Sequence, residues 1–183
     1  MTLPRGFKAN AERAAAEIRA KMGLRPYSPV DIVQVAAERG IPVLDAGDLI
    51  DIQRLEEIER LQAFAFSAAT FKIEDRHFIV TNPIRTPERR VSDIAHELAH
   101  VCLEHDLSEI REFAGIPFRT CKPDEEEQAT AFGGTLMLPR PLLLRGAGQG
   151  LGPAEIAAKY GVSLEMARFR FNTTGVARQL QRH

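Results

Sequence analysis

The sequence predicts an α+β fold in which helices surround a small antiparallel or mixed β-sheet, with a helical C-terminal subdomain. Apolar residues recur at helical spacing in several segments, and two β-rich segments stand close together at residues 62–72 and 77–81. Residues 153–172 have the pattern of two short helices. A chain of 183 residues suits one domain with a small appendage. We predict a domain over residues 1–145 and a helical subdomain over residues 146–183 that packs on it.

The composition argues against a nucleic-acid-binding, membrane-spanning or secreted protein. The 24 basic and 25 acidic residues give a net charge of −1, so no overall positive field attracts nucleic acid. No apolar run approaches the ~20 residues that cross a membrane. The first residues lack the apolar segment of a secretory signal. The only cysteines, Cys102 and Cys121, are too few for a small secreted scaffold, and we therefore expect a cytoplasmic protein.

The first half of the chain combines helical and strand patterns. Apolar residues at i, i+3 and i+4 predict a helix over residues 9–22. A second helix is expected to begin with Ser28 as its N-cap and Pro29 in its first turn, and to end at Gly40. Residues 41–44 are a candidate for a short strand. Residues 48–60 fit a helix, but they lie close to the expected start of the sheet, so their prediction is ambiguous.

The second half of the chain is predicted to be mainly helical. Proline residues mark the start of one helix, at Pro123, and its end, at Pro139 and Pro141. We expect, in chain order, a connector over residues 106–122 with a short helix near 108–114, a helix over 124–138, a glycine-rich break over 146–152, and short helices over 153–160 and 163–172.

An amphipathic helix is predicted to begin at Thr86 and to carry the sequence HELAH at residues 96–100. Thr86 supplies the cap, Pro87 the first helical position and Glu88 an acidic side chain in the first turn. Apolar side chains form a buried stripe along this helix: Val91, Ala95, Leu98 and Cys102.

The HExxH spacing is typical of a zinc hydrolase. His96 and His100 lie four residues apart, so both imidazoles project from one helix face and can reach one small cation. Glu97 lies about 100° further round, where its carboxylate can act as a general base on water instead of coordinating the ion. The alternative interpretation is a surface helix with two histidines and a glutamate. The clean cap and the strong amphipathicity favour a metal site.

A catalytic zinc needs a third protein ligand and an open fourth position. His105 lies too close to His100 in sequence, and His183 is at the terminus, so we expect a glutamate from the following helix. Of the consecutive glutamates at 125–127, Glu126 is the favoured ligand and Glu127 the alternative. Glu126 shares a face with small residues that would let the two helices approach closely: Ala129, Thr130 and Gly133.

The cysteines are less informative. Cys102 points to the buried stripe and is expected to be a core residue. Cys121 comes just before the glutamate helix and could approach the metal, although its spacing does not demand this.

A second functional hypothesis comes from residues 156–168, which resemble a helix-turn-helix with glycine in the turn. Arg168, Arg170 and Arg178 add positive charge, but the surrounding chain is neutral, which argues against nucleic-acid binding. The alternative function is therefore a DNA-binding or protein-interaction regulator, antitoxin-like or anti-repressor-like, with little or no proteolysis.

The chain resembles the ImmA/IrrE family of zinc metallopeptidases, which are of the minimal gluzincin type. The resemblance covers most of the chain. It includes residues 29–32 and 40–43, the strand that ends at Asn82, residues 94–100, 126–132, 136–139 and 161–163, and Arg168. The family register places the glutamate ligand at Glu126. Thr130 departs from the family pattern, which usually has asparagine there, and alters any hydrogen bond that supports the ligands. At two further positions, Gly133 stands where the family usually has alanine and Leu138 where it usually has methionine.

The resemblance implies a zincin-like domain with one Zn²⁺ per chain, held by His96, His100 and Glu126, and with Glu97 as the catalytic base. It also implies a cytoplasmic endopeptidase that cleaves a regulatory protein, often a helix-turn-helix transcriptional repressor, to switch a stress response or a mobile element. An oxyanion donor should complete the site, and the candidates are Tyr160, His105 and Arg168. An extended substrate could pair with a free edge at residues 77–81, which otherwise form an ordinary sheet strand.

Overall fold

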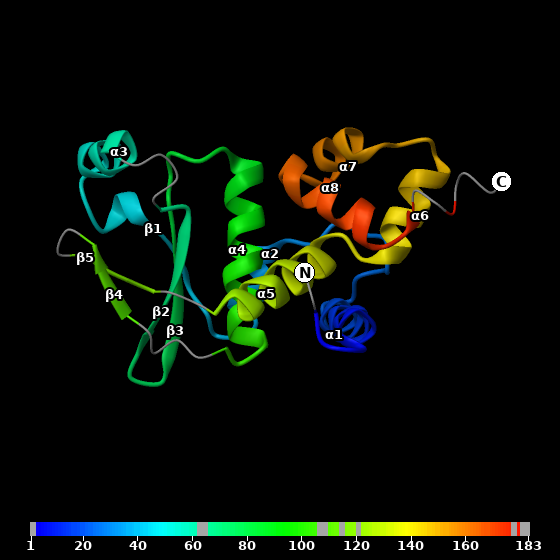
Figure 1. Ribbon diagram of the computed structural model, residues 1–183, viewed down its shortest axis with the longest axis horizontal. Helices are drawn as coiled ribbons and strands as arrows, with labels where there is room; N and C mark the ends of the chain where they lie inside the picture. The colour runs from blue at the N-terminus through cyan, green and yellow to red at the C-terminus, as the bar shows by residue number, and fades with distance from the viewer. Residues whose placement is uncertain are drawn as a thin grey trace.

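The computed structural model describes residues 3–61, 66–105, 110–113, 116–119, 122–176 and 179. Within these ranges the chain forms eight α-helices, a three-stranded mixed sheet and a two-stranded hairpin, so the predicted α+β class is confirmed. Figure 1 shows the sheet on one side of helix α4 (Pro87–Cys102) and most of the other helices on the opposite side. None of the described helices is long and apolar enough to cross a membrane.

The three-stranded sheet has the order β1-β3-β2. Its strands are β1 (Val43–Asp45), β2 (Ala68–Ile73) and β3 (Arg76–Thr81). β1 runs parallel to β3, whereas β2 pairs antiparallel with β3 and places Thr70 opposite Ile79. The sheet is thus small and mixed, as the sequence predicts.

Of the two interpretations of residues 77–81, the free edge is wrong and the ordinary sheet strand is confirmed. These residues belong to β3, which is the central strand and is hydrogen-bonded on both sides. Within the described part of the chain, β2 is the edge strand on the side away from β1.

The helices follow the predicted order with three corrections. Their bounds are α1 (Phe7–Lys21), α2 (Ile32–Ala37), α3 (Ile52–Leu61), α4, α5 (Pro123–Met137), α6 (Arg140–Gly148), α7 (Pro153–Tyr160) and α8 (Leu164–Thr173). A 3-10 turn, η1 (Ala46–Asp48), precedes α3, so the ambiguous segment at residues 48–60 is mostly helical. The first correction concerns α2, whose N-cap is Asp31 and not Ser28, because the Asp31 carboxylate accepts the N–H groups of Val33 and Gln34.

The second and third corrections concern α6 and the connector. The stop predicted at Pro139 and Pro141 is confirmed for α5, which ends at Met137, but the chain then forms a further helix, α6, over residues 140–148 that was not predicted from the sequence. Pro141 lies in the first turn of α6, where a missing N–H costs no intrahelical hydrogen bond. The helix expected near 108–114 is wrong, because the connector contains an antiparallel hairpin of β4 (Ile110–Phe113) and β5 (Ile116–Arg119).

Two buried arginines hold the C-terminal end of α5. The Arg19 guanidinium donates to the carbonyl of Leu136 (2.8 Å), and the Arg170 guanidinium donates to the carbonyl of Leu138 (3.0 Å). Arg170 also forms an ion pair of 2.6 Å with Glu12. The last carbonyls of a helix have no intrahelical partner, so these guanidinium groups replace the water that would otherwise satisfy them. They fix α5 relative to α1 and α8.

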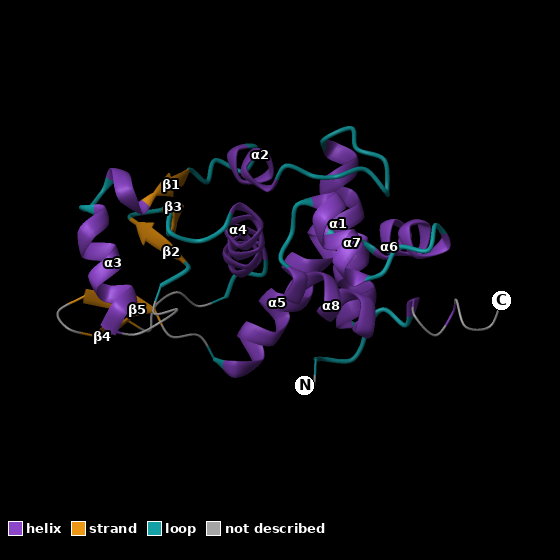
Figure 2. Cartoon of the chain, turned by 90° about the horizontal axis from the view of Figure 1, so that it is seen from above, coloured by secondary structure: helices purple, strands orange, loops and turns teal. Residues whose placement is uncertain are grey.

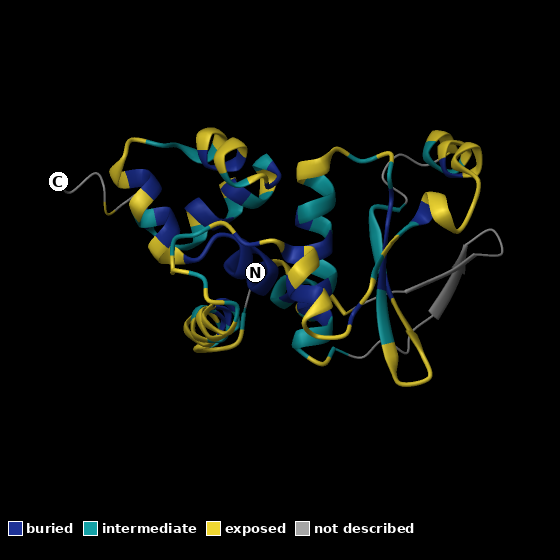
Figure 3. Cartoon of the chain, turned by 180° about the vertical axis from the view of Figure 1, so that it is seen from behind, coloured by how far each residue is buried: buried dark blue, intermediate teal, exposed yellow. Residues whose placement is uncertain are grey.

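The main hydrophobic core joins α4 to the helices beyond it. Figure 2 shows α4 between the sheet and a group that includes α1, α5, α7 and α8. One cluster of buried side chains contains residues from both sides of position 145, among them Leu98, Leu142 and Ile156. In Figure 3 the buried positions gather along α4, α5 and the neighbouring helices, whereas the outer turns of α1 and α3 are largely exposed. The division into residues 1–145 and 146–183 stays a prediction.

Candidate metal centre

Helix α4 presents its histidines on the face that α5 crosses. Thr86 caps α4 by accepting the N–H of Arg89 at 3.4 Å, and Pro87 stands in the first turn, as the sequence predicts. Ala95 and Leu98 are fully buried. His100 is 1% exposed in its side chain, whereas 25% of the His96 side chain is exposed. One imidazole is therefore enclosed by protein and the other opens toward solvent.

The small residues of α5 let it approach the backbone of α4. A Cβ atom built on Gly133 would lie 2.5 Å from the carbonyl oxygen of Ala95 and 2.8 Å from its carbonyl carbon. Such distances are far below van der Waals contact, so only glycine fits at this crossing. Gly134 has a different neighbour, because its Cβ would lie 2.9 Å from Cδ of Arg170. Each of the two glycines answers a packing need, at a cost of about 1 kcal/mol in helix propensity.

The crossing brings His96, His100 and Glu126 together into a group that could hold a metal ion. The Nε2 atoms of His96 and His100 lie 3.1 Å apart. Oε2 of Glu126 lies 3.0 Å from Nε2 of His96, and Oε1 of Glu126 lies 3.4 Å from Nε2 of His100. Ligand atoms about 2.0–2.1 Å from a tetrahedral zinc would lie about 3.3 Å from one another. Both the donor set and its spacing therefore fit such an ion.

Of the consecutive glutamates that begin α5, Glu126 is the one whose carboxylate faces the histidines. Glu125 forms an ion pair with Lys122 at 3.7 Å, and Glu127 is outside the group that could hold a metal. Helical geometry explains this, because successive side chains point about 100° apart.

The electrostatics of His96 show that the site favours positive charge. Burial of the imidazole disfavours its charged form. A hydrogen bond with Glu126 and the negative charges of Glu97, Glu126 and Asp93 outweigh that effect, so the pKa of His96 is raised. A cation held between the same groups would benefit from the same attraction.

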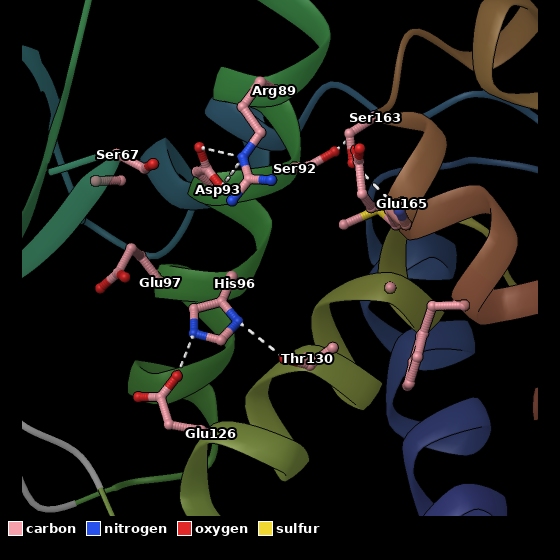
Figure 4. A pocket seen from close by; sticks show the side chains of 14 residues that line it. Ser67, Arg89, Ser92, Asp93, His96, Glu97, Glu126, Thr130, Ser163 and Glu165 are labelled. Carbon is pink, nitrogen blue, oxygen red and sulfur yellow. Dashed lines mark hydrogen bonds and ion pairs between the residues drawn. The ribbon is translucent and has the colours of Figure 1, made fainter. Parts of the chain in front are cut away.

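Thr130 supports His96 from the side away from the other ligands. Its Oγ1 lies 3.4 Å from Nδ1 of His96, one helical turn after Glu126. Figure 4 shows the His96 ring between Glu126 and Thr130, with dashed lines to both. A threonine hydroxyl thus replaces the asparagine that the family pattern usually has at this position, and it can still accept a hydrogen bond.

Glu97 points away from this group and toward the sheet. The buried hydroxyl of Thr70 on β2 donates to Oε2 of Glu97 at 2.7 Å. The charge-assisted bond fixes the rotamer of a carboxylate that would otherwise turn freely. Sequence reasoning missed Thr70, because nothing in a strand pattern shows which residue of α4 it will face.

A cavity of about 430 Å³ opens beside His96, Glu97 and Glu126. Its walls come from α4, from Ser67 just before β2 and Ala68 at its start, and from α5 and α8. Figure 4 shows its upper part, where Arg89 pairs with Asp93 at 2.9 Å. Burial raises the pKa of Asp93, and Arg89 partly offsets the shift.

The three candidate oxyanion donors, Tyr160, His105 and Arg168, are absent from the described lining of this cavity. Cys102 is partly buried among core residues, and burial raises the pKa of its thiol, which disfavours the thiolate that a metal needs. Cys121 lies outside the described residues.

The described site has His96, His100 and Glu126 on two crossing helices, and a further glutamate, Glu97, at the cavity beside them. This arrangement is typical of metallopeptidases with an α+β fold. The family model Peptidase M78, described as the IrrE N-terminal-like domain, matches residues 57–172. The chain therefore belongs to the ImmA/IrrE family, which confirms the resemblance seen in the sequence.

Comparison with solved structures supports the fold. A chain described as a Mycobacterium tuberculosis transcriptional regulator matches with a TM-score of 0.58 and 18% sequence identity. The match covers 89% of this chain and 46% of that chain, so this chain spans about half the length of its structural relative. At this identity the match shows a shared fold alone. A comparison with curated protein sequences gave no match.

The crossing at Gly133 gives a stability prediction with an internal control. Replacing Gly133→Ala should lower the free energy of unfolding by about 1–3 kcal/mol, because the new methyl overlaps the Ala95 backbone. Gly148→Ala, at the exposed end of α6 with nothing near its Cβ, should be neutral or stabilising by up to about 1 kcal/mol. Urea denaturation of both variants measures the difference, and equal effects would refute the close-approach argument.

Proposed function

We propose that this protein is a zinc-dependent endopeptidase. The observation that carries the proposal is the convergence of His96, His100 and Glu126 next to Glu97 at an open cavity. Membership of the ImmA/IrrE family supports a metallopeptidase. Two imidazole nitrogens and one carboxylate are a common protein ligand set of catalytic zinc, and we infer one Zn²⁺ per chain.

When bound, zinc would supply Lewis-acid activation of water and of the scissile carbonyl. The remaining chemistry falls to the chain itself. Glu97 takes a proton from the attacking water and later passes it to the leaving amine, which is general base and then general acid catalysis. Thr70 holds the Glu97 carboxylate in one orientation through its 2.7 Å hydrogen bond.

The substrate is inferred to be a protein segment in extended conformation. Ala68, the first residue of β2, and Ser67 just before it line the cavity, and β2 is the edge strand of the described sheet. An extended peptide that pairs with β2 would run past Glu97 and His96 toward α8. The free edge is thus assigned to β2 in place of residues 77–81.

From membership of the ImmA/IrrE family we infer that the target is a cytoplasmic regulatory protein, in particular a helix-turn-helix transcriptional repressor whose cleavage switches a stress response or a mobile element. The structural relative described as a transcriptional regulator is compatible with a role in regulation.

DNA binding by α7 and α8 is less well supported. The two helices are joined by a short turn in which Gly161 has a left-handed conformation, as a helix-turn-helix requires. Of the arginines that would contact DNA, Arg170 is buried and paired with Glu12, which leaves Arg168 exposed on the same helix. Arg178 lies outside the described residues. Among the candidate arginines that the structure describes, Arg168 alone is exposed, and on a chain of net charge −1 it gives little attraction for phosphate.

Replacing Glu97→Gln tests the proposed activity. The purified chain, loaded with zinc, is incubated with the transcriptional repressor encoded beside it, and cleavage is followed by mass spectrometry. The variant should still bind one zinc per chain, because Glu97 is not a ligand, whereas the rate of cleavage should fall about 100-fold or more. Glu88→Gln, at an exposed position on the same helix, is the matched control and should cleave normally. Undiminished cleavage by the Glu97→Gln variant, or wild-type protein that binds no zinc at neutral pH, would contradict the proposal.

Thr70 gives a second prediction. Thr70→Val keeps the shape of the side chain but removes the hydrogen bond to Glu97, so kcat should fall about tenfold or more while KM and zinc affinity stay unchanged. Thr70→Ser keeps a hydroxyl and should retain most of the activity. Steady-state kinetics on a peptide that spans the cleavage site separates kcat from KM. Equal losses in both variants would mean that Thr70 matters only for packing.

A further inference from the structure

A third histidine lies directly behind the candidate metal ligand His100. Nδ1 of His105 is 2.9 Å from Nδ1 of His100, and the rings meet edge to face with centroids 4.9 Å apart. The Nδ1 edge of His100 is opposite to the Nε2 edge that faces His96 and Glu126. His105 therefore contacts the ligand from behind and takes no part in the described group that could hold the ion.

The end of α4 is shaped to bring His105 to this position. The N–H of His105 donates to the carbonyl of His100 (3.0 Å), and the N–H of Glu104 donates to the carbonyl of Val101 (3.1 Å). This pair of hydrogen bonds is a Schellman motif, and it commonly brings together apolar side chains at the two positions that His105 and His100 occupy. Here the contact joins two imidazoles.

The turn that closes the motif carries strain. Glu104 has a φ of 55°, a left-handed conformation in which glycine or asparagine is usual and which costs about 1–2 kcal/mol for other residues. Backbone strain of this kind persists where the surrounding structure requires it, often at functional sites. The strained residue immediately precedes His105.

If His100 binds a metal through Nε2, the proton of the hydrogen bond between the two rings lies on Nδ1 of His100. A neutral imidazole that offers its Nε2 lone pair to a cation carries its proton on Nδ1. His100 is then the donor and His105 the acceptor of the 2.9 Å hydrogen bond. Thr130 serves the Nδ1 edge of His96, but that contact is longer (3.4 Å) and lies on the exposed side. The buried ligand thus has the closer partner.

We propose that His105 is a positioning residue of the metal centre: it accepts the Nδ1–H of His100 and so aims Nε2 of His100 at the ion. The proposal rests on the proposed zinc site and deepens it. It also reassigns His105, which the sequence suggested as an oxyanion donor, because its ring lies behind the ligand and outside the described lining of the cavity.

Two substitutions separate a positioning role from simple packing. His105→Leu fills much of the same space without an acceptor. His105→Asn places its Oδ1 where Nδ1 stands, at the same number of bonds from the backbone, and can accept the hydrogen bond. The zinc dissociation constant of the full chain, measured by competition with a chelator, should rise about 10–100-fold in the His105→Leu variant. It should change by less than about threefold in the His105→Asn variant, because the acceptor that supports His100 remains. Circular dichroism of both metal-free variants checks that they fold.

The outcomes distinguish the two levels of the proposal. Wild-type affinity in the His105→Leu variant, or equal weakening in both variants, would overturn the role of His105 while the zinc site stands. An unfolded His105→Leu variant together with weakened binding in a folded His105→Asn variant would also overturn it. Wild-type protein that binds no zinc would overturn the proposed function itself, and the role of His105 with it.

Discussion

The close crossing of α4 and α5 at Gly133 is the contact on which the candidate site depends. At this crossing the backbone of α5 lies against the carbonyl of Ala95, one residue before His96. Glu126 stands two helical turns before Gly133, so the crossing sets where its carboxylate meets the histidines. The far end of α5 is held by the guanidinium groups of Arg19 and Arg170. A shift of one residue in the register of this helix would turn Glu126 away from the histidines.

The polar groups of α4 near this crossing face two different neighbours, α5 on one side and the sheet on the other. On the side of α5, burial disfavours the charged form of His96, but a hydrogen bond with Glu126 and the charges of Glu97, Glu126 and Asp93 raise the pKa of this imidazole. On the side of the sheet, Thr70 anchors Glu97, so the two glutamates point in different directions and need not compete for one ion. Zinc that binds between the histidines would also link α4 to α5, and we expect metal binding to stabilise the fold.

The sequence predicted those features that depend on local spacing. The cap at Thr86, the shared face of His96 and His100 and the small residues after Glu126 follow from helical periodicity, and they led to the helix pair that the structure contains. Two contacts that depend on three-dimensional geometry could not be predicted. The pairing of Thr70 with Glu97 depends on how the sheet lies on α4, and the contact of His105 with His100 depends on a left-handed turn at a glutamate. Two predictions about single helices were wrong for local reasons. Helix α6 was not expected, but its first turn accommodates Pro141, and the N-cap of α2 is Asp31 because its own carboxylate accepts the first N–H groups.

The most direct test of the account is a crystal structure of the zinc-loaded chain with diffraction data collected at the zinc absorption edge. The account predicts one anomalous peak per chain, about 2.0–2.2 Å from Nε2 of His96, Nε2 of His100 and a carboxylate oxygen of Glu126. A peak bound by other residues, coordination by Glu127 in place of Glu126, or no peak in protein saturated with zinc would contradict it.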